Sequence, residues 1–254
     1  MGMLSNREKI FVSVAGFDNT SGAGILLDAR VAQSLKQNFF SVSSCVTSQS
    51  FFASKKHIKM QVIDRTLFVD QLKTIQANQI MAIKIGLMPS VDLAKDLVGF
   101  LKKWQKHESF PVVLDPIYSA TLGKNFIPQK QYLKIQQILL PHVQVITPNK
   151  REWALLKKLA FKQTPSVVVT DADDASTTIH HFLYEGGTLK AQFEMPKLEF
   201  SVIRGTGCAF SSALAIFLAK GINMLPANKK AAKHVQRGIN KGVSINGIRY
   251  LHWN

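Results

Sequence analysis

Short apolar runs alternate with segments of helical spacing along most of this chain, and this alternation constrains the fold more than any other feature. The runs have the length and composition of strands that are buried on both faces of a sheet. They occupy residues 10–15, 39–46, 80–85, 111–114, 143–146 and 166–169. Residues 64–77 and 91–104 lie between them and have helical periodicity. The succession predicts an α/β fold with a mainly parallel sheet, helices on both sides, and ligands beyond the carboxyl ends of the strands.

The last third of the sequence predicts a hairpin followed by two helices. Residues 184–188 read Tyr-Glu-Gly-Gly-Thr between two strand-like runs, which is typical of a hairpin turn. One helix begins near Cys208, and a basic helix follows over about residues 226–244.

Length and composition indicate one domain. The chain has 254 residues, 46% of them hydrophobic, and no linker or low-complexity stretch divides it. Residues 1–9 lack a signal-peptide core, and no run of about 18 apolar residues is present. Cys45 and Cys208 form no disulfide framework or metal-ligand cluster. We therefore expect a single cytoplasmic domain over residues 1–254 that does not enter a membrane.

The formal net charge of +16 is the strongest compositional signal. It is compatible with nucleic acid, a membrane surface or an acidic small substrate. The lysines occur in short, dispersed clusters, and no long basic arm or nucleic-acid motif is present. We interpret the charge as solvated helix faces that also attract polyphosphate, and we expect no nucleic-acid partner. The clusters are Lys55-Lys56, Lys102-Lys103, Lys157-Lys158 and Lys229-Lys230.

The turn Gly205-Thr206-Gly207-Cys208 precedes a long apolar helix. Backbone N–H groups at a helix N-terminus lack partners inside the helix, so this turn is suited to bind an anion such as a phosphate. The same field lowers the pKa of a thiol in the first turn, which makes Cys208 a candidate base or nucleophile. The alternative, an ordinary N-cap followed by a small buried cysteine, is equally compatible with these four residues.

Polar and glycine residues follow the first two predicted strands. The glycine-rich turn over residues 15–24 lacks both the dinucleotide-binding spacing and the P-loop pattern. Asp28 falls about one turn into the following helix, and Gln49 ends the second strand. Each is a candidate ligand-binding residue, although each alone is also typical of an ordinary polar position.

Acidic and amide residues follow two later strands. Asp115 ends one strand, and Thr147-Pro148-Asn149 ends the next and opens a helix that contains Glu152. Glu152 either compensates the helix dipole or offers a hard oxygen ligand near Mg²⁺.

Five blocks of sequence, in order, resemble the hydroxymethylpyrimidine and phosphomethylpyrimidine kinase branch of the ribokinase-like superfamily, the enzymes of thiamine biosynthesis. The last block is the most specific, because most sugar kinases of the superfamily have Asp where this branch has Cys. The resemblance covers about residues 10–245 and implies a three-layer α/β/α sandwich around a central, mainly parallel sheet. The blocks are Ala15-Gly16-Phe17-Asp18 with residues 21–25, Lys84-Ile85-Gly86-Leu87-Met88, Val113-Leu114-Asp115-Pro116, Thr147-Pro148-Asn149 with Glu152, and Gly205-Thr206-Gly207-Cys208 with residues 211–215.

The resemblance implies a role for each matching residue at a pyrimidine site. Asp28 and Gln49 match positions that hydrogen-bond the amino group and ring nitrogens of the pyrimidine, and Gly16 matches the backbone beside it. Leu87 and Ile117 match apolar positions near the ring, where the family more often has Met and Val.

The resemblance also implies the residues that handle the phosphoryl group. Gly205, Thr206 and Gly207 match an anion hole for the transferred group, and Cys208 matches the residue that takes the proton of the substrate hydroxyl. Asp115, Asn149 and Glu152 match positions around Mg²⁺ and the ATP phosphates. Phosphoryl transfer depends on positioning and charge neutralisation, and this set of residues offers both.

Four departures from the family pattern bear on activity. The family has Lys-Gly-Gly-His, with the lysine near the ATP phosphates, where this chain reads Thr170-Asp171-Ala172-Asp173. The interval from Asn149 to Thr170 is short for the family, as though most of one helix were missing. The family's Ala-Gln-Asn-Thr reads Ser48-Gln49-Ser50-Phe51, and an Asp after Ser-Gly is replaced by Lys124 after Leu122-Gly123. These changes weaken the expectation of fast turnover and do not affect the expected fold.

We therefore expect an ATP- and Mg²⁺-dependent kinase, acting as a homodimer, that phosphorylates 4-amino-5-hydroxymethyl-2-methylpyrimidine and also, as an open possibility, its monophosphate. Pyridoxal or pyridoxine kinase activity is a close alternative. A non-catalytic member that binds the pyrimidine is an alternative of a different class, and nucleic-acid binding, suggested only by charge, is a distant fourth. The first question for the structure is whether Lys84, Lys124 or Arg204 replaces the missing lysine.

Overall fold

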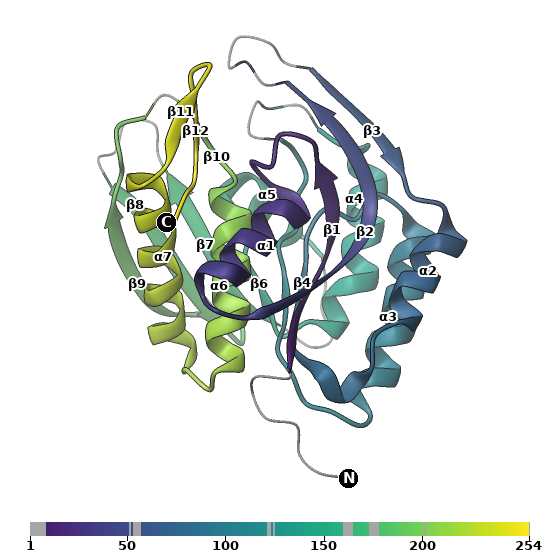
Figure 1. The fold of residues 1–254 in the computed structure, drawn as a ribbon. Coiled ribbons are helices and arrows are strands. Elements are labelled where there is room, and N and C mark those ends of the chain that lie inside the picture. The colour runs from purple at the N-terminus through teal and green to yellow at the C-terminus, as the bar shows by residue number, and fades with distance from the viewer. Residues whose placement is uncertain are drawn as a thin grey trace.

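A nine-stranded sheet forms the centre of the molecule (Figure 1). The computed structural model describes residues 9–50, 52, 57–120, 123, 125–159, 165–172, 178–200 and 202–253, with only the backbone at 171 and 172. The strand order is β3-β2-β1-β4-β5-β6-β7-β8-β9. The run from β2 to β7 is parallel, whereas β3, β8 and β9 each pair antiparallel with their neighbour. This arrangement confirms the predicted, mainly parallel sheet.

The elements follow one another in a βα alternation that ends in a small second sheet, β10-β12-β11. The strands are β1 (Ile10–Asp18), β2 (Asn38–Gln49), β3 (Ile58–Val62), β4 (Ile80–Ile85), β5 (Val112–Leu114), β6 (Val145–Ile146), β7 (Ser166–Ala172), β8 (Thr178–Glu185), β9 (Thr188–Pro196), β10 (Ile203–Arg204), β11 (Val243–Ile245) and β12 (Ile248–Tyr250). The helices are α1 (Gly24–Ser34), α2 (Arg65–Lys73), α3 (Val91–Gln105), α4 (Gln129–Leu139), α5 (Lys150–Leu156), α6 (Thr206–Ala219) and α7 (Met224–Asn240), with short 3-10 turns η1 (Ala77–Gln79) and η2 (Leu140–His142).

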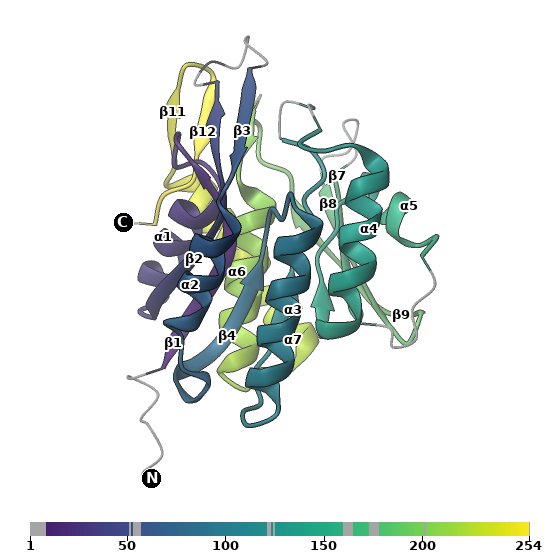
Figure 2. The same cartoon turned by 90° about the vertical axis from the view of Figure 1, so that its right-hand side faces the viewer.

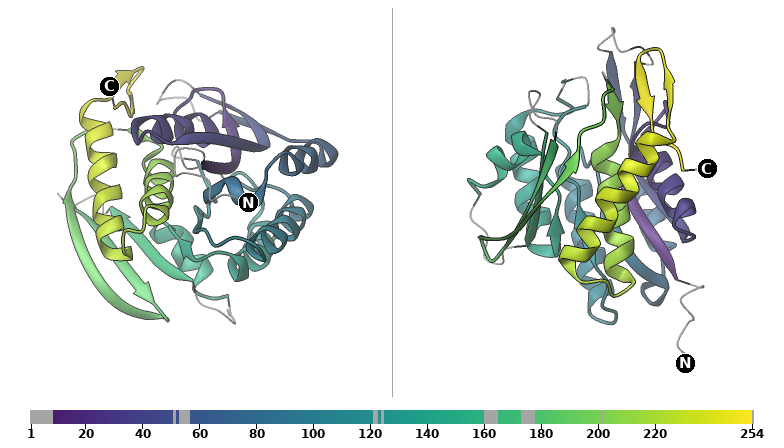
Figure 3. Two further views of the ribbon diagram at one scale, coloured as in Figure 1. Left: turned by 60° about the horizontal axis from the view of Figure 1, so that its bottom comes forward. Right: turned by 90° about the vertical axis from the view of Figure 1, so that its left-hand side faces the viewer.

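Two hydrophobic cores lie on opposite faces of the sheet, because successive side chains of a strand point to opposite sides. Val12 and Val14 of β1 pack toward α2, α3 and α4, whereas Phe11 packs toward α1, α6 and α7. Figures 2 and 3 show these two helical layers with the sheet between them. The strands are apolar on both faces because both faces are covered, and the expected α/β/α sandwich is confirmed.

The first two strands are longer than predicted. The apolar runs suggest ends at residues 15 and 46, but β1 continues to Asp18 and β2 to Gln49. Their parallel pairing persists through a register shift at Ala15 and Gly16, so polar residues continue the ladder. The extension brings the side chains of Asp18 and Gln49 to the same end of the sheet.

Helix α2 is shorter than the predicted segment 64–77. The Asp64 carboxylate accepts hydrogen bonds from the backbone N–H groups of Thr66 and Leu67, so it caps the helix rather than joining it. The helix ends at Lys73, before the extended residue Gln76.

The C-terminal helix also ends earlier than predicted. We expected helix to residue 244, but α7 ends at Asn240 and the chain continues into the hairpin of β11 and β12. Asn246 and Gly247 have φ values of 50° and 80°, the conformation of an Asn-Gly hairpin turn. The turn at Gly186 and Gly187, in contrast, lies where the sequence predicts it and joins β8 to β9.

Some sequence-based predictions fall outside the described residues. They concern the N-terminal segment 1–8, the lysine pair at 55–56, Phe51, the segment containing Lys124, and Asp173. Within the described part of the chain, none of the helices has the length and apolar character needed to span a bilayer.

Candidate functional site

Two glycine turns meet backbone to backbone where β1 ends and α6 begins. Gly24 has φ +61°, and a Cβ there would lie 2.1 Å from the Gly16 carbonyl oxygen. Gly205 has φ +78°, and a Cβ there would lie 2.1 Å from the Gly22 carbonyl oxygen. Only glycine tolerates both the left-handed conformation and this approach. The contact holds the N-terminus of α6 against the end of the first strand.

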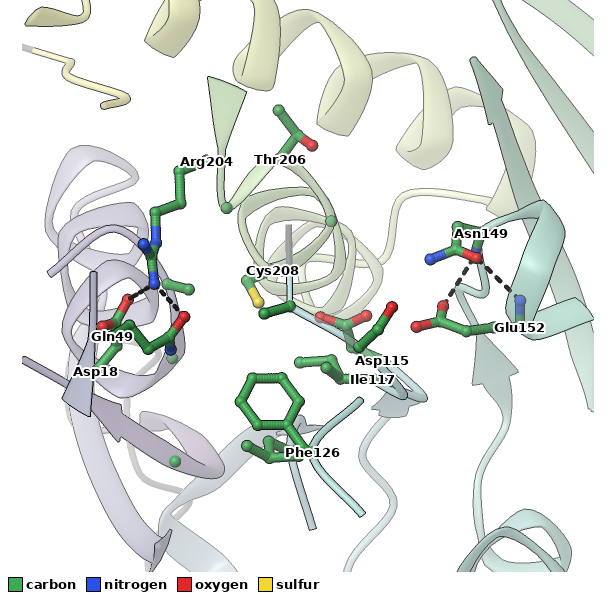
Figure 4. Close-up of a pocket in the computed structure, with 18 of the residues that line it drawn as sticks. Asp18, Gln49, Asp115, Ile117, Phe126, Asn149, Glu152, Arg204, Thr206 and Cys208 are labelled. Carbon is green, nitrogen blue, oxygen red and sulfur yellow. Dashed lines mark hydrogen bonds and ion pairs between the residues drawn. The ribbon is translucent and has the colours of Figure 1, made fainter. Parts of the chain in front are cut away.

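A cavity of about 450 Å³ opens at this point, beyond the carboxyl ends of the parallel strands (Figure 4). We call it the central cavity. Every residue that the sequence places at the site lines it except Asp28. The predicted residues that line it are Gly16, Gln49, Leu87, Asp115, Ile117, Asn149, Glu152, Thr170, Gly205, Thr206, Gly207 and Cys208. Their shared location is a structural fact, and their individual roles stay predictions.

Asp28 is placed differently from the prediction. Its side chain has no exposed surface, and its carboxylate accepts hydrogen bonds from Ser13 Oγ at 2.5 Å and Ser212 Oγ at 2.8 Å. The Lys84 ammonium lies 2.9 Å from Asp28 Oδ2 and 3.1 Å from Oδ1. The carboxylate is therefore engaged inside the protein and does not line the central cavity, and its direct contact with a ring substrate stays a prediction.

Lys84 is the ion-pair partner of Asp28. Burial works to lower the pKa of Lys84, but the negative charges around it, led by Asp28, outweigh burial and raise this pKa above its ordinary value. Its ammonium also lies 3.9 Å from Asp115 Oδ2. Lys84 is a fully buried partner of two carboxylates and does not line the cavity, so it does not replace the lysine that the family has near ATP.

Cys208 lies in the first turn of α6, as predicted, but its protonation differs from the prediction. Burial raises the pKa of the Cys208 thiol well above its ordinary value, and Lys84 opposes this shift only in part. The expected lowering by the helix N-terminus is outweighed because the thiol is only 7% exposed. Cys208 is a neutral thiol at physiological pH in this structure.

Asp115 and Glu152 face the other side of the cavity. Asn149 caps α5: its side chain accepts from the Glu152 backbone N–H at 2.9 Å, and Glu152 Oε2 accepts from the Asn149 backbone N–H at 3.0 Å. Glu152 Oε1 accepts from the Tyr118 backbone N–H at 3.0 Å. Burial raises the pKa of Glu152 to about 8 and also raises that of Asp115.

The two carboxylates fit a magnesium ion held largely by water and phosphate. Mg²⁺ usually keeps several waters and takes only one or two protein carboxylates together with substrate phosphates. Asp115 and Glu152 supply that number at one cavity wall. The described residues contain no group of three or more His, Cys, Asp or Glu that would enclose a metal.

A third group of polar side chains lies on the opposite wall, around Arg204. This arginine donates to Asp18 Oδ2 at 3.2 Å, to the Gln49 side-chain oxygen, and to the Ser50 carbonyl at 3.4 Å. Figure 4 shows the Arg204 group and the Asn149 group on opposite sides of Cys208. Arg204 therefore points away from the Asn149 side, and it does not replace the missing family lysine either.

A second cavity, of about 600 Å³, adjoins the first, and we call it the side cavity. Its walls are mostly apolar and come from β8, β9, α6 and α7; they include Ile179, Met195, Leu198, Phe210 and Val235. Six residues line both cavities and form their junction. They are Asn149, Arg151, Thr170, Ile203, Thr206 and Gly207.

His181 is the buried polar group of the side cavity. Its ring stacks on Phe193 with centroids 4.5 Å apart, and its Nδ1 has no hydrogen-bonding partner among the described residues. Burial lowers the pKa of His181 to about 4, so the ring is neutral at physiological pH.

The sequence did not identify several residues that line the central cavity, among them Asp18, Thr47, Phe126 and Arg151. Asp18 follows Gly16 in the first family block, which was a usable signal, and Arg151 lies inside the Asn149-to-Glu152 block. Arg151 lines both cavities and is the cation of the junction among the described residues. Its guanidinium lies 5.6 Å from the Tyr118 ring centroid.

Comparison with known proteins agrees with this geometry. The sequence pattern of the phosphomethylpyrimidine kinase family matches residues 18–252. The chain belongs to this family of kinases. A hydroxymethylpyrimidine/phosphomethylpyrimidine kinase of Aquifex aeolicus is 27% identical over 91% of this chain and 94% of its own length. The corresponding kinase of Rhizobium meliloti is 26% identical over 91% of this chain and 90% of its own length.

Solved structures share the ribokinase-like fold. The pyridoxal kinase of Staphylococcus aureus, solved with AMP-PCP and pyridoxal, has a TM-score of 0.82 at 19% identity and covers 96% of this chain and 93% of its own. A phosphomethylpyrimidine kinase of Clostridium difficile has a TM-score of 0.73 at 20% identity over 91% of this chain and 99% of its own. At these identities the likeness concerns the fold alone and does not select a substrate.

The Asp28–Lys84 pair predicts a large loss of stability when one partner is removed. Asp28→Asn keeps the shape of the side chain but leaves a buried ammonium without its main counter-charge, and we expect a loss of about 3–5 kcal/mol in the free energy of unfolding. The double variant Asp28→Asn, Lys84→Met removes the stranded charge and should be more stable than Asp28→Asn alone. Urea denaturation of the three proteins measures this, and a loss below about 1 kcal/mol in Asp28→Asn would show that the pair is not the constraint we describe.

His181 predicts a dependence of stability on pH. Its pKa is about 4 in the folded protein and about 6.5 in the unfolded chain. The unfolded state therefore binds more protons between these values, and stability falls as the pH drops from 6.5 to 4. His181→Phe preserves the aromatic stack and should remove on the order of 3 kcal/mol of that fall. His234, whose pKa burial also lowers to about 4, stays as the internal reference. The free energy of unfolding of both proteins is measured at pH 7, 5.5 and 4.5. An equal fall in the two proteins would show that His181 is not the source of the pH dependence.

Proposed function

We propose that this protein transfers the terminal phosphoryl group of ATP to the hydroxymethyl group of a small heteroaromatic alcohol. One observation supports this most strongly: the N-terminus of α6 opens into the junction of two cavities of different chemistry. Gly205 at the N-cap has no side chain, so no side-chain cap occupies the first N–H groups of the helix. These groups form an anion hole at the place where a phosphoryl group would pass from one cavity to the other.

The side cavity is suited to the nucleotide base. A nucleotide joins a flat, largely apolar base to a polyanionic tail, and the two cavities offer an apolar space next to a cationic junction. With the base in the side cavity, the tail reaches Arg151, Asn149 and the anion hole. The net positive charge of the chain favours the approach of such an anion.

We place the magnesium ion at the cavity wall formed by Asp115 and Glu152, on the side of the phosphates. When bound, Mg²⁺ supplies charge neutralisation on the phosphates during transfer. Asp115 and Glu152 would hold it through their cavity-facing carboxylates. The raised pKa values of both carboxyls indicate that this wall favours a bound cation, since a positive charge offsets the cost of two buried negative ones.

Cys208 is suited to relay the proton of the substrate hydroxyl late in the reaction: its sulfur takes that proton as its own thiol proton passes to Asp115, with which it is hydrogen-bonded. Its thiol is neutral in the free protein, so it first hydrogen-bonds the hydroxyl. A loose phosphoryl-transfer transition state leaves the attacking oxygen with its proton until bond formation is advanced, so a strong base is not required. The Lys84 ammonium stabilises the negative charge that develops on the sulfur during this relay.

Two substrates are candidates. The family pattern favours 4-amino-5-hydroxymethyl-2-methylpyrimidine and its monophosphate, which would place the protein in thiamine biosynthesis, in the cytoplasm and as a homodimer. Pyridoxal is the second candidate, because the Staphylococcus aureus protein that shares this fold was solved with pyridoxal. A protein that binds the ring without phosphorylating it is the competing function, and the specific observation in its favour is Thr170, which places a hydroxyl at the junction instead of a cation.

Release of ADP in the presence of each candidate ring tests the kinase function, and Cys208 provides the matched variant. We expect Cys208→Ala to lose at least about a hundredfold in kcat while it stays folded, since proton-transfer groups contribute about 10² to 10⁴. Cys208→Ser should lose activity in the same direction. Near-wild-type turnover in Cys208→Ala would remove this residue from the mechanism. ADP release at background with every ring in the unmodified protein would instead favour the binding-only function.

Arg151 predicts how the chain manages without the family lysine. If its guanidinium neutralises the phosphates at the junction, Arg151→Gln should lower kcat/KM for ATP by at least about tenfold, since an electrostatic donor aimed at the transferring group is worth that much or more. Thr170→Lys placed in the Arg151→Gln background should then restore part of the loss, because Thr170 lines the same junction.

Arg65→Gln on α2 is a control, since that arginine pairs with Asp96 at the surface. An unchanged kcat/KM in Arg151→Gln would show that another group serves the phosphates.

A further inference from the structure

The substrate end of the central cavity carries a buried arginine whose role the phosphoryl-transfer chemistry does not explain. Arg204 is only 4% exposed, yet it lines the cavity next to Asp18, Thr47 and Gln49. It lies on β10, one residue before the anion-hole turn. Figure 4 shows its guanidinium directed to Asp18 and Gln49. It therefore borders the space for the ring and not the space for the phosphates.

Arg204 is held rigidly in this place. A Cβ on Gly22 would lie 2.5 Å from Arg204 Cδ and 2.9 Å from Tyr250 Cε1, so the turn packs directly on the arginine and on a residue of the C-terminal hairpin. Strand β10 pairs with β12, and Arg204 is aligned with Tyr250. A side chain fixed along its whole length presents its N–H groups in a defined direction.

The side-chain acceptors of this wall are already used inside the protein. Asp18 accepts from the Thr20 backbone N–H, from Thr20 Oγ1 and from Arg204. The Gln49 oxygen accepts from Arg204, and Thr47 Oγ1 accepts from Gln49 Nε2 at 3.1 Å. A carboxylate offers about four lone-pair sites. Three donors already occupy Asp18, and the Thr20 hydroxyl lies 3.0 Å from both of its oxygens, so little of its capacity is left.

Some N–H groups of Arg204 and Gln49, in contrast, have no partner among the described residues. A guanidinium carries five N–H groups, and the described residues accept three hydrogen bonds from Arg204. The Gln49 amide has two N–H groups, of which one bonds Thr47. Arg204 and Gln49 therefore keep N–H groups without a partner among the described residues, whereas Asp18 is largely occupied and the Gln49 oxygen already accepts from Arg204. We infer that this wall favours a ring edge that offers acceptors.

We propose that Arg204 is a specificity-determining residue that selects rings presenting a hydrogen-bond acceptor, such as a hydroxyl, phenolate or ether oxygen, in place of an exocyclic amino group at the edge facing Asp18 and Gln49. An amino group offers only donors there, and a buried donor without a partner lowers affinity. The inference rests on the proposed function, because it assumes that the ring occupies this end of the central cavity. It points to hydroxypyridines such as pyridoxal, and away from the 4-aminopyrimidine.

A matched pair of rings tests the proposal. The first is 4-amino-5-hydroxymethyl-2-methylpyrimidine, and the second carries a 4-methoxy group in place of the amino group, which changes a donor to an acceptor and leaves the ring nitrogens unchanged. Calorimetric titration with AMP-PCP present should show the methoxy ring binding at least about tenfold more tightly, and pyridoxal should follow the methoxy ring. In Arg204→Gln the preference should fall to within about threefold, because the glutamine oxygen accepts from an amino group.

Arg204→Lys is the conservative variant, since it keeps the charge beside Asp18 and offers donors only, and it should retain the preference. If Arg204→Gln does not fold, the double variant Asp18→Asn, Arg204→Gln removes the stranded carboxylate and carries the same expectation. A merely structural role for Arg204 would change the affinities for both rings together and leave their ratio unchanged. Three results would overturn the proposal. They are an unchanged ratio of the two affinities in Arg204→Gln, a preference for the amino ring in the unmodified protein, and failure of all three rings to bind.

ADP release with the same rings separates this inference from the proposed function. If the methoxy ring and pyridoxal bind as expected but no ring supports ADP release, the kinase function fails and the selection by Arg204 stands. If the amino ring is phosphorylated as well as the others and Arg204→Gln leaves their ratio unchanged, the kinase function stands and the selection by Arg204 fails.

Discussion

A buried ammonium holds the site together. Lys84 has no exposed surface, and a charge removed from water must find counter-charges of good geometry. It finds them in Asp28 on α1 and Asp115 after β5, and Asp28 in turn is bonded by Ser13 of β1 and Ser212 of α6. Elements from the first third, the middle and the last third of the chain are thereby fixed around one ammonium. The placement of α6, which begins with the Gly205–Cys208 turn, depends on the neutralisation of that charge.

Two opposite walls of the central cavity differ in their charged groups. The Asp115 and Glu152 wall holds two carboxyls whose pKa values burial raises, so a cation there would stabilise their ionised forms. On the Arg204 wall, Asp18 and the Gln49 oxygen already accept from the guanidinium. The start of α6 lies between them, where the proposed function places the phosphoryl group. In such an arrangement the protein's charges are already in place before a ligand binds, so no charged side chain has to move during the proposed reaction.

The sequence predicted the architecture because the hydrophobic pattern of each segment agrees with its position in the layers of the fold. Buried runs such as Ile80–Ile85 indicate strands, and the βαβ order then fixes which ends of the strands lie together. It also located about half of the residues that line the central cavity, most of which follow those strands. The sequence did not reveal that Asp28 bonds Lys84 instead of lining the cavity, because that pairing depends on tertiary packing. The low pKa expected for Cys208 is wrong because burial, which also depends on packing, raises it. Whether the chain forms one domain stays a prediction.

Residues 248–253 support the wall of the central cavity that carries Arg204. Strand β12 holds β10 in place, and the segment behind it is fastened to α7 and α1: Trp253 donates to the His234 carbonyl at 2.9 Å, and Arg30 donates to the Leu251 carbonyl. During synthesis, β1 emerges long before residues 248–253 do. Asp18 therefore gains its arginine partner, held by β12, only after most of these residues have been made. A truncation that removes residues 248–253 acts on the architecture of the pocket, because it removes the strand that pairs with β10.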